Sequence, residues 1–372
     1  MKHSSLFTAA IAAAASFVLP LVSRAQAPPP YAYGPVPPLL DQRDVYAADR
    51  PNRLSPTVRG FPSRIYVPNS ESNTVDIIDP ATFKVISHFP VGRLPQHVVP
   101  SWDLRTLWVA NDLGNSLTPI DPRTGKPGKP VPVDDPYNLY FTPDGRYAIV
   151  VCERLRRLDF RDAHTMKLVH SLTVPSKGVD HLDFSRDGRY LIASAEFAGS
   201  VLKVDVAAQK LVGVLKLRAG GMPQDVKLSP DGRVFYVADM ASNGVFLVDG
   251  DRFQKVGFVP TGAGAHGLYA SRDSKMLYVS NRGEGSISLI SFATRQVMRK
   301  WHLAGGGSPD MGGVSADGKT LWLSGRYNEE VYAIDTATGK LRKRIRVGGG
   351  PHGLCVYPQP GRYSLGHTGV FR

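Results

Sequence analysis

The stretch Tyr140-Phe141-Thr142-Pro143-Asp144-Gly145-Arg146-Tyr147-Ala148-Ile149-Val150 decides the fold, because it joins two short apolar runs through a tight turn. The turn returns at intervals of 41, 43, 44, 42, 44 and 43 residues, at Asp103, Asp144, Asp187, Asp231, Asp273, Asp317 and, in altered form, Pro360. A period in the low forties with about four strands per unit is typical of a β-propeller blade. One blade alone would leave its faces and edges uncovered, so the units must stack and close into a ring. We predict an all-β, seven-bladed β-propeller, with eight blades as the alternative.

The repeat has a partial unit at each end of the chain. Residues 64–91 supply a second, a third and a fourth strand without a first strand before them. The stretch from His352 to Tyr357 supplies a first strand, and Arg362 to Leu365 resembles a second strand. We therefore expect N-terminal and C-terminal strands to share one blade and close the ring. Because both ends carry a segment of the second type, the sequence leaves open which of them occupies that place.

The second strands of four units share a pattern that carries a family resemblance. They read Tyr66-Val67-Pro68-Asn69, Trp108-Val109-Ala110-Asn111, Tyr236-Val237-Ala238-Asp239 and Tyr278-Val279-Ser280-Asn281. This pattern resembles the repeat that names the YVTN, or YncE-like, seven-bladed propellers, and it covers the chain from about Arg64 to the end. The resemblance implies the architecture, with more distant similarity to haem-d1 and lactonase propellers. Since those relatives differ in function, the resemblance alone implies no single activity.

The first 27 residues have the composition of a secretion signal. Lys2 and His3 precede an uncharged, Ala-rich run, and Ala25-Gln26-Ala27 offers small residues at the positions that a signal peptidase reads. A membrane anchor is the alternative, but Pro20 interrupts the run and a Pro-rich stretch follows. We expect a signal peptide over 1–27, a Pro-rich spacer over 28–63 and the propeller over 64–372. The expected location is periplasmic or extracellular, with no transmembrane segment after cleavage.

Charge and cysteine content narrow the function classes only a little. The net charge is +13 and falls to +11 once Lys2 and Arg24 are removed, which permits binding to a polyanion. The basic residues are spread around the repeats, however, and such residues commonly keep blade edges solvated. Cys152 and Cys355 fall in different blades, too far apart for a disulfide, so we expect two unpaired, buried thiols. The sequence has no CxxCH haem-attachment motif and no CxxC pair.

Polar residues recur at two places in the repeat that we expect to line one mouth of the central channel. Where the first strands begin, the pairs are Gln96-His97, Tyr137-Asn138, Asp180-His181, Gln224-Asp225, His266-Gly267, Asp310-Met311 and His352-Gly353. Where the second strands end, the residues are Asn69, Asn111-Asp112, Cys152-Glu153, Glu196, Asp239, Asn281-Arg282, Arg326 and His367. The candidate ligand-binding residues are His97, His181, Asp225, His266, His352, Glu153, Glu196, Arg282 and Arg326. The structural alternative is that these residues cap turns and bond backbone amides.

The sequence contains no local catalytic or metal motif. HExxH and GxSxG are absent, so any metal site must be assembled across blades, and both the catalytic residues and the cofactor stay unknown. We favour an exported propeller that binds a small molecule or a protein partner at the channel mouth. One alternative is a lactonase-like hydrolase, with Glu153, Glu196 or His181 in acid–base roles, Arg282 stabilising an oxyanion and a divalent metal.

A second alternative is a tetrapyrrole or redox protein similar to haem-d1 propellers, in which His97, His181, His266 or His352 would be axial ligands. A polyanion-binding protein is the third. Whether the chain is an enzyme at all stays open.

Export yields the first testable prediction. We expect the mature chain to begin at Pro28, because Ala25 and Ala27 suit a peptidase that accepts small side chains. The intact mass of protein recovered from the periplasm or the medium measures the cleavage point. A chain that retains Met1 in the membrane fraction would contradict the prediction.

Overall fold

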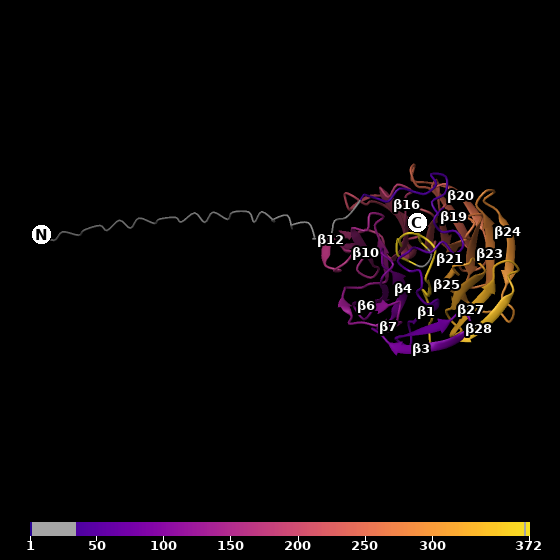
Figure 1. Cartoon of the computed structure of the whole chain (residues 1–372). Coiled ribbons are helices and arrows are strands. Elements are labelled where there is room, and N and C mark those ends of the chain that lie inside the picture. The colour runs from indigo at the N-terminus through magenta and orange to yellow at the C-terminus, as the bar shows by residue number, and fades with distance from the viewer. Residues whose placement is uncertain (2–34, 368–369) are drawn as a thin grey trace. The chain divides into compact units, whose positions relative to one another are not determined.

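The computed structural model describes Met1, residues 35–367 and residues 370–372. From residue 35 onward, the chain forms seven antiparallel sheets arranged in a ring, each with its strands running in order from the channel outward (Figure 1). This arrangement is the predicted seven-bladed propeller, so the eight-bladed alternative is wrong. Among the described residues the only helical element is the single 3-10 turn η1 (Glu196–Ala198).

The first four blades, written from the innermost strand outward, have the following bounds. The closing blade contains β29 (Cys355–Tyr357), β1 (Arg64–Asn69), β2 (Thr74–Asp79) and β3 (Lys84–Pro90). The next contains β4 (Pro95–Pro100), β5 (Leu107–Asn111), β6 (Ser116–Asp121) and two short outer strands, β7 (Lys126–Pro127) and β8 (Val131–Pro132). Then follow β9 (Asn138–Phe141), β10 (Tyr147–Cys152), β11 (Arg157–Asp162) and β12 (Leu168–Thr173). The fourth blade contains β13 (Val179–Phe184), β14 (Tyr190–Ala195), β15 (Ser200–Asp205) and β16 (Lys210–Lys216).

The other three blades repeat the same order. They contain β17 (Pro223–Leu228), β18 (Val234–Asp239), β19 (Gly244–Asp249) and β20 (Gln254–Pro260); β21 (Ala265–Ala270), β22 (Met276–Asn281), β23 (Ser286–Ser291) and β24 (Val297–His302); and β25 (Pro309–Val314), β26 (Thr320–Gly325), β27 (Glu330–Asp335) and β28 (Leu341–Arg346). The innermost strands are buried throughout, whereas outermost strands such as β3, β12 and β28 are largely exposed.

The hydrophobic core is divided among the interfaces between neighbouring blades. The described residues form seven clusters of buried apolar side chains, each drawn from one pair of adjacent blades, and the segments before β1 and after β29 add side chains to three of them. The cluster around Trp322, Ile65 and Val67 joins the last blade to the closing blade. Each blade thus buries both of its faces only because it has a neighbour on each side, as expected for a closed ring.

The repeated turn that revealed the fold is held by a hydroxyl–carboxylate contact. In the fourth blade, Ser185 Oγ donates to Asp187 Oδ1 (2.8 Å), and the same oxygen accepts from the Arg189 amide (3.1 Å). Gly188 then takes a φ of +73°, which a glycine adopts without steric cost. Equivalent Ser or Thr to Asp contacts occur in the turns at Asp103, Asp144, Asp231, Asp273 and Asp317.

The ring closes as predicted, and the structure shows which segment forms the second strand of the closing blade. β29 pairs with β1 in antiparallel register, with Ile65 opposite Val356 and Tyr66 opposite Cys355. The second strand of the closing blade is therefore the N-terminal β1. The expectation that Arg362 to Leu365 behaves as a second strand is wrong.

The C-terminal segment instead forms a hairpin that occupies the channel, where the yellow end of the chain lies within the ring (Figure 1). Its two arms meet at the bridge between Ser364 and Phe371, and Gly366 forms a bridge with Tyr140 of β9. The Phe141 amide donates to the Leu365 carbonyl (2.9 Å). The segment therefore leaves the repeat, because its backbone bonds are made to the innermost strand of another blade.

Residues before Arg64, within the stretch expected to be a spacer, also pack against the propeller. Val45 and Tyr46 are buried and join the core between the fourth and fifth blades, and the Tyr46 hydroxyl donates to the Leu228 carbonyl (2.6 Å). Asp49 forms a buried ion pair with Arg272 (2.6 Å). Residues of the Pro-rich region thus add apolar and ionic contacts across turns of several blades, which its composition did not reveal.

Three other expectations concern the thiols, the signal peptide and the membrane. Cys152 and Cys355 are both free and buried, as predicted. The signal peptide and the first part of the spacer fall within residues 2–34 and lie outside the described residues. Over the part of the chain that the structure does describe, no helix is long and apolar enough to span a membrane.

Removal of residues 35–63 tests whether this packing contributes to stability. A chain starting at Arg64 loses the buried side chains of Val45, Tyr46 and Val58. At ~25 cal/mol per Å² of apolar surface, we expect it to lose at least about 3 kcal/mol in free energy of unfolding relative to a chain starting at residue 35. The melting temperature should then fall by about 6 °C or more. Equal melting temperatures would show that the segment contributes no stability.

Candidate functional site

A β-bulge recurs where the innermost strand of a blade begins, and it delivers the candidate residues into the channel. In the fourth blade the pairing of β13 with β14 skips from Val179 to Leu182, which leaves Asp180 and His181 without cross-strand partners. The same skip occurs in the blades of β17, β21 and β25, and a related shift lies beside His97. Because an unpaired residue in a bulge is turned out of the ladder, these side chains can converge on the axis.

Five histidines form one continuous buried group at this level of the channel. The His97 ring lies 5.3 Å from that of His181, 4.9 Å from that of His352 and 5.1 Å from that of His367, measured between ring centroids. His266 extends the group, with its ring 5.9 Å from that of His352. His97, His181, His266 and His352, which the sequence places at the start of first strands, thus lie together in the structure.

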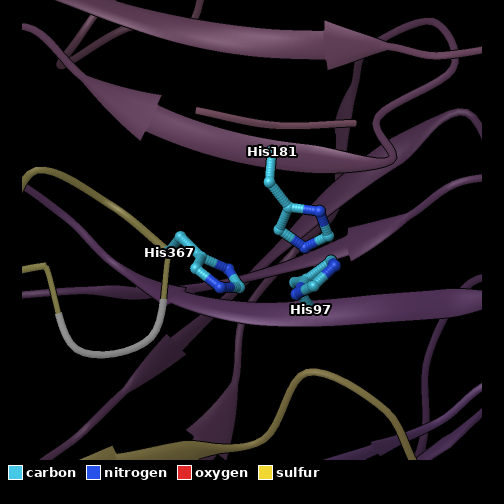
Figure 2. A group of neighbouring side chains, drawn as sticks. All are labelled: His97, His181 and His367. Carbon is cyan, nitrogen blue, oxygen red and sulfur yellow. The ribbon is translucent and has the colours of Figure 1, made fainter. Parts of the chain in front are cut away.

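His367 does not lie where its place in the repeat predicts. It lies at the tip of the C-terminal hairpin, and its ring is 4.8 Å from that of His181 (Figure 2). Figure 2 shows His97, His181 and His367 turned toward one another, with His367 arriving from the C-terminal segment. Repeat alignment placed His367 at the end of a second strand, because Arg362 to Leu365 looks like one. The Gly366-His367 pair, lying after the last complete repeat, was the available sign of a separate role.

Several ring nitrogens in this group have no hydrogen-bond partner among the described residues. Both nitrogens of His97 are in this state, as are His352 Nδ1 and His367 Nε2. His181 Nδ1 lies 2.8 Å from Asp180 Oδ1, but at an angle that does not make a hydrogen bond. Buried polar atoms normally have partners, so this set is unusual.

The protonation of the histidines follows from burial and mutual repulsion. Burial lowers the pKa of His97, His266 and His352 well below the usual range, and neighbouring cationic groups lower it further. The pKa of His367 falls to about 4, because burial outweighs the opposing effect of Asp225. Burial also disfavours the charged form of His181, but Asp180 more than compensates and raises its pKa. Most of the group is thus neutral imidazole at pH 7.

Two aspartates beside the histidines differ in role. Asp310 faces His266 Nδ1 (3.1 Å), His352 Nδ1 (3.3 Å) and Arg282 Nη1 (3.2 Å), so its carboxylate pairs with the Arg282 cation beside two neutral rings. Asp225 accepts from the amides of Val226 and Leu268, both at 2.9 Å, and its Oδ1 is 3.7 Å from His367 Nε2. Burial would raise the pKa of Asp225, but His367 and Lys227 lower it to about 2. Asp225 therefore serves both the strand backbone and the channel.

The predicted residues at the ends of the second strands are divided between structural and channel roles. Arg326 donates to Ser70 Oγ (3.0 Å) and to the Gly350 carbonyl (3.3 Å), so it ties the last blade to the closing blade. The asparagines of the YVTN-like pattern are structural as well, since Asn281 Nδ2 donates to Ser286 and Ser288 (both 3.0 Å). Arg282 faces the channel aspartate Asp310 and lies over the Tyr327 ring at 5.4 Å. Arg326 acts on the channel as well, since its charge adds to burial in lowering the pKa of His352.

The two glutamates are partly buried and hold their protons strongly. Burial, followed by the charges of Asp180 and Glu196, raises the pKa of Glu153 to about 9. Burial and Asp180 raise the pKa of Glu196 to about 7, against the opposing effects of Gln224, Arg282 and His181. Both therefore feel the same channel aspartate as His181, which places them in one electrostatic environment.

A tetrapyrrole does not fit the histidines as they are arranged. His97, His181 and His367 have no exposed surface, and their rings contact one another at centroid distances of 4.8 to 5.3 Å. A macrocycle bound through one of these rings would have to displace the others.

Comparisons with known proteins agree with the architecture. The family model described as YNCE-like beta-propeller matches residues 55–361. A dihydro-heme d1 dehydrogenase of Pseudomonas aeruginosa is 23% identical over 322 residues, covering 80% of this chain. The chain spans only 63% of the length of that curated relative.

Solved structures with the same architecture have different functions. Hydrazine synthase of Kuenenia stuttgartiensis aligns with a TM-score of 0.65 and 20% identity, over 78% of this chain and 97% of that one. Dihydro-heme d1 dehydrogenase in complex with DHE aligns with a TM-score of 0.61 and 19% identity, over 82% of this chain and 76% of that one. A candidate 6-phosphogluconolactonase of Bacteroides uniformis aligns with a TM-score of 0.62 and 18% identity, over 79% of this chain and 99% of that one. At these identities the likeness to solved structures concerns the fold. The family model matches most of the length of this chain, so the chain belongs to the YNCE-like β-propeller family.

Proposed function

We propose that this protein is an exported binding propeller, whose central channel holds a small ligand among His97, His181, His266, His352 and His367. The observation that carries the proposal is the set of buried ring nitrogens without partners. Each buried polar group left unpaired costs about 1–3 kcal/mol, so a purely structural role gives no reason to retain several together. A ligand that pairs with these nitrogens gives a reason to retain them.

The arrangement argues against the capping alternative for the histidines. Capping residues bond nearby backbone groups, as Asp225 does here by accepting from the Val226 amide. His97 makes no side-chain hydrogen bond to the described residues, and it contacts mainly other channel rings. The export component rests on the N-terminal composition alone, and the polyanion alternative on the basic charge.

A lactonase-like hydrolase is the second candidate, favoured by Glu196. A carboxyl group whose pKa lies near 7 can take and return a proton at neutral pH, as general acid–base catalysis requires. Glu153, Asp180 and Arg282 share its electrostatic environment. The tetrapyrrole alternative is weaker, because the histidines that would bind an iron are in contact with one another.

Replacing a channel histidine by an apolar residue tests the binding role without knowledge of the ligand. We expect His97→Leu to raise the free energy of unfolding of ligand-free protein by about 1–2 kcal/mol, since it removes two unpaired buried nitrogens. The melting temperature should rise by about 2–6 °C. His302→Leu, on the exposed outer strand β24, is the matched control and should change stability little. A clear loss of stability in His97→Leu would mean that the ring is structural.

The carboxyl of Glu153 gives a prediction in pH. Between about pH 4.5 and 9 the unfolded chain releases this proton while the folded chain retains it, so this group lowers the free energy of unfolding as the pH rises. Glu153→Gln should therefore melt about 2 °C or more above wild type at pH 8, and at the same temperature at pH 4. Glu71→Gln, on an exposed loop of the closing blade, is the control. An equal shift at both pH values would rule out titration of Glu153 as the cause.

A further inference from the structure

The strongest feature within the channel is a set of three histidines from three separate parts of the chain. One ring nitrogen from each of His97, His181 and His367 can be chosen so that all three atoms lie within 4.8 Å of one another. Nitrogens around a tetrahedral ion with bonds of about 2.0–2.1 Å are roughly 3.3 Å apart, so small ring rotations would bring these three to bonding distance. No other such group of His, Cys, Asp or Glu occurs among residues 35–367 and 370–372.

We propose that His97, His181 and His367 form a binding site for one divalent late transition-metal ion of the zinc and copper class. The proposal rests on the function proposed above and names the ligand of that channel. Imidazole nitrogen suits zinc, copper and nickel, whereas magnesium and calcium require oxygen ligands. Three protein ligands leave one position of a tetrahedral ion open for water or a further small ligand.

The surroundings of the three rings agree with a metal site. Asp180 lies 2.8 Å from His181 Nδ1. A carboxylate beside a histidine ligand commonly fixes the orientation of the ring. Gly353 makes room for His97, since a Cβ at this position would overlap its ring. Asp180 and Gly353 are therefore positioning residues for His181 and His97.

The origin of the third ligand gives the site a structural consequence. His97 and His181 come from β4 and β13, whereas His367 is carried by the C-terminal hairpin. An ion bound to all three would fasten that hairpin to the innermost strands of two blades. Metal binding should then protect the hairpin, an effect that an ion bound to exposed histidines would not have.

Metal titration of untagged protein tests the proposal. We expect one Zn²⁺ or Cu²⁺ per chain by calorimetry and elemental analysis, and no binding of Mg²⁺ at the same concentration. His97→Ala, His181→Ala and His367→Ala should each weaken Zn²⁺ binding at least 100-fold. His170→Ala and His302→Ala, on the exposed outer strands β12 and β24, should leave the affinity unchanged. Affinity that falls only in these two control variants would overturn the proposal.

Two measurements on the wild-type chain keep the test decisive if a variant fails to fold. Co²⁺ should produce the intense visible absorption of a tetrahedral nitrogen site, and Zn²⁺ should slow hydrogen exchange at the Leu365 and Val370 amides. Absence of both effects at millimolar metal would overturn the metal site. If His97→Leu nevertheless stabilises the protein, the binding role of the channel stands and its ligand is not a metal ion.

Discussion

The pairing of β29 with β1 is the contact on which the rest of the structure depends. Three residues of the C-terminal strand, Cys355–Tyr357, complete a blade whose other strands come from the start of the propeller. Without that pairing the first and last blades would each have one uncovered face, and the core around Trp322 and Ile65 would be open to water. Closure also sets the position of the residues that follow Tyr357. Since β29 is an innermost strand, the chain leaves it at the channel, and the last fifteen residues can turn inward and carry His367 to the axis.

Division of the core into seven interfaces explains how the channel can hold groups that do not favour folding. The apolar clusters lie mainly between blades, whereas the five channel histidines contact chiefly one another's rings at the axis. Unpaired nitrogens at the axis therefore lower the stability while most of the packing between blades lies elsewhere. A protein with one central core would have to place such groups within the core itself. This separation of stability from function is a physical reason why related propellers differ so widely in activity.

The fold could be predicted from the sequence because the residues that specify local structure recur in the repeats. Asp187-Gly188 and its counterparts specify the turn, and the alternation of apolar runs specifies the strands. Convergence of His97, His181, His266 and His352 also followed, because the ring places equivalent positions together. The two segments outside the repeat could not be read in the same way. Tyr46 lies in a Pro-rich stretch without strand periodicity, and its burial depends on a surface formed by two blades. His367 was assigned to a strand by likeness, although long-range contacts with Tyr140 and Phe141 determine its place.

The channel is also asymmetric, and this asymmetry bears on what the site can do. The C-terminal hairpin fills part of the channel, with Arg372 buried against Asp183 (3.5 Å) and the Ser185 carbonyl (3.0 Å). Ser185 begins a turn between the first and second strands, so the hairpin is anchored at the face of the ring that carries these turns. His97 and His181 lie near the start of their strands, toward the opposite face, where Glu153, Glu196 and Arg282 follow the ends of the second strands. A ligand arriving from that face would meet ionisable groups before the histidines. The C-terminal hairpin would close the route beyond the histidines.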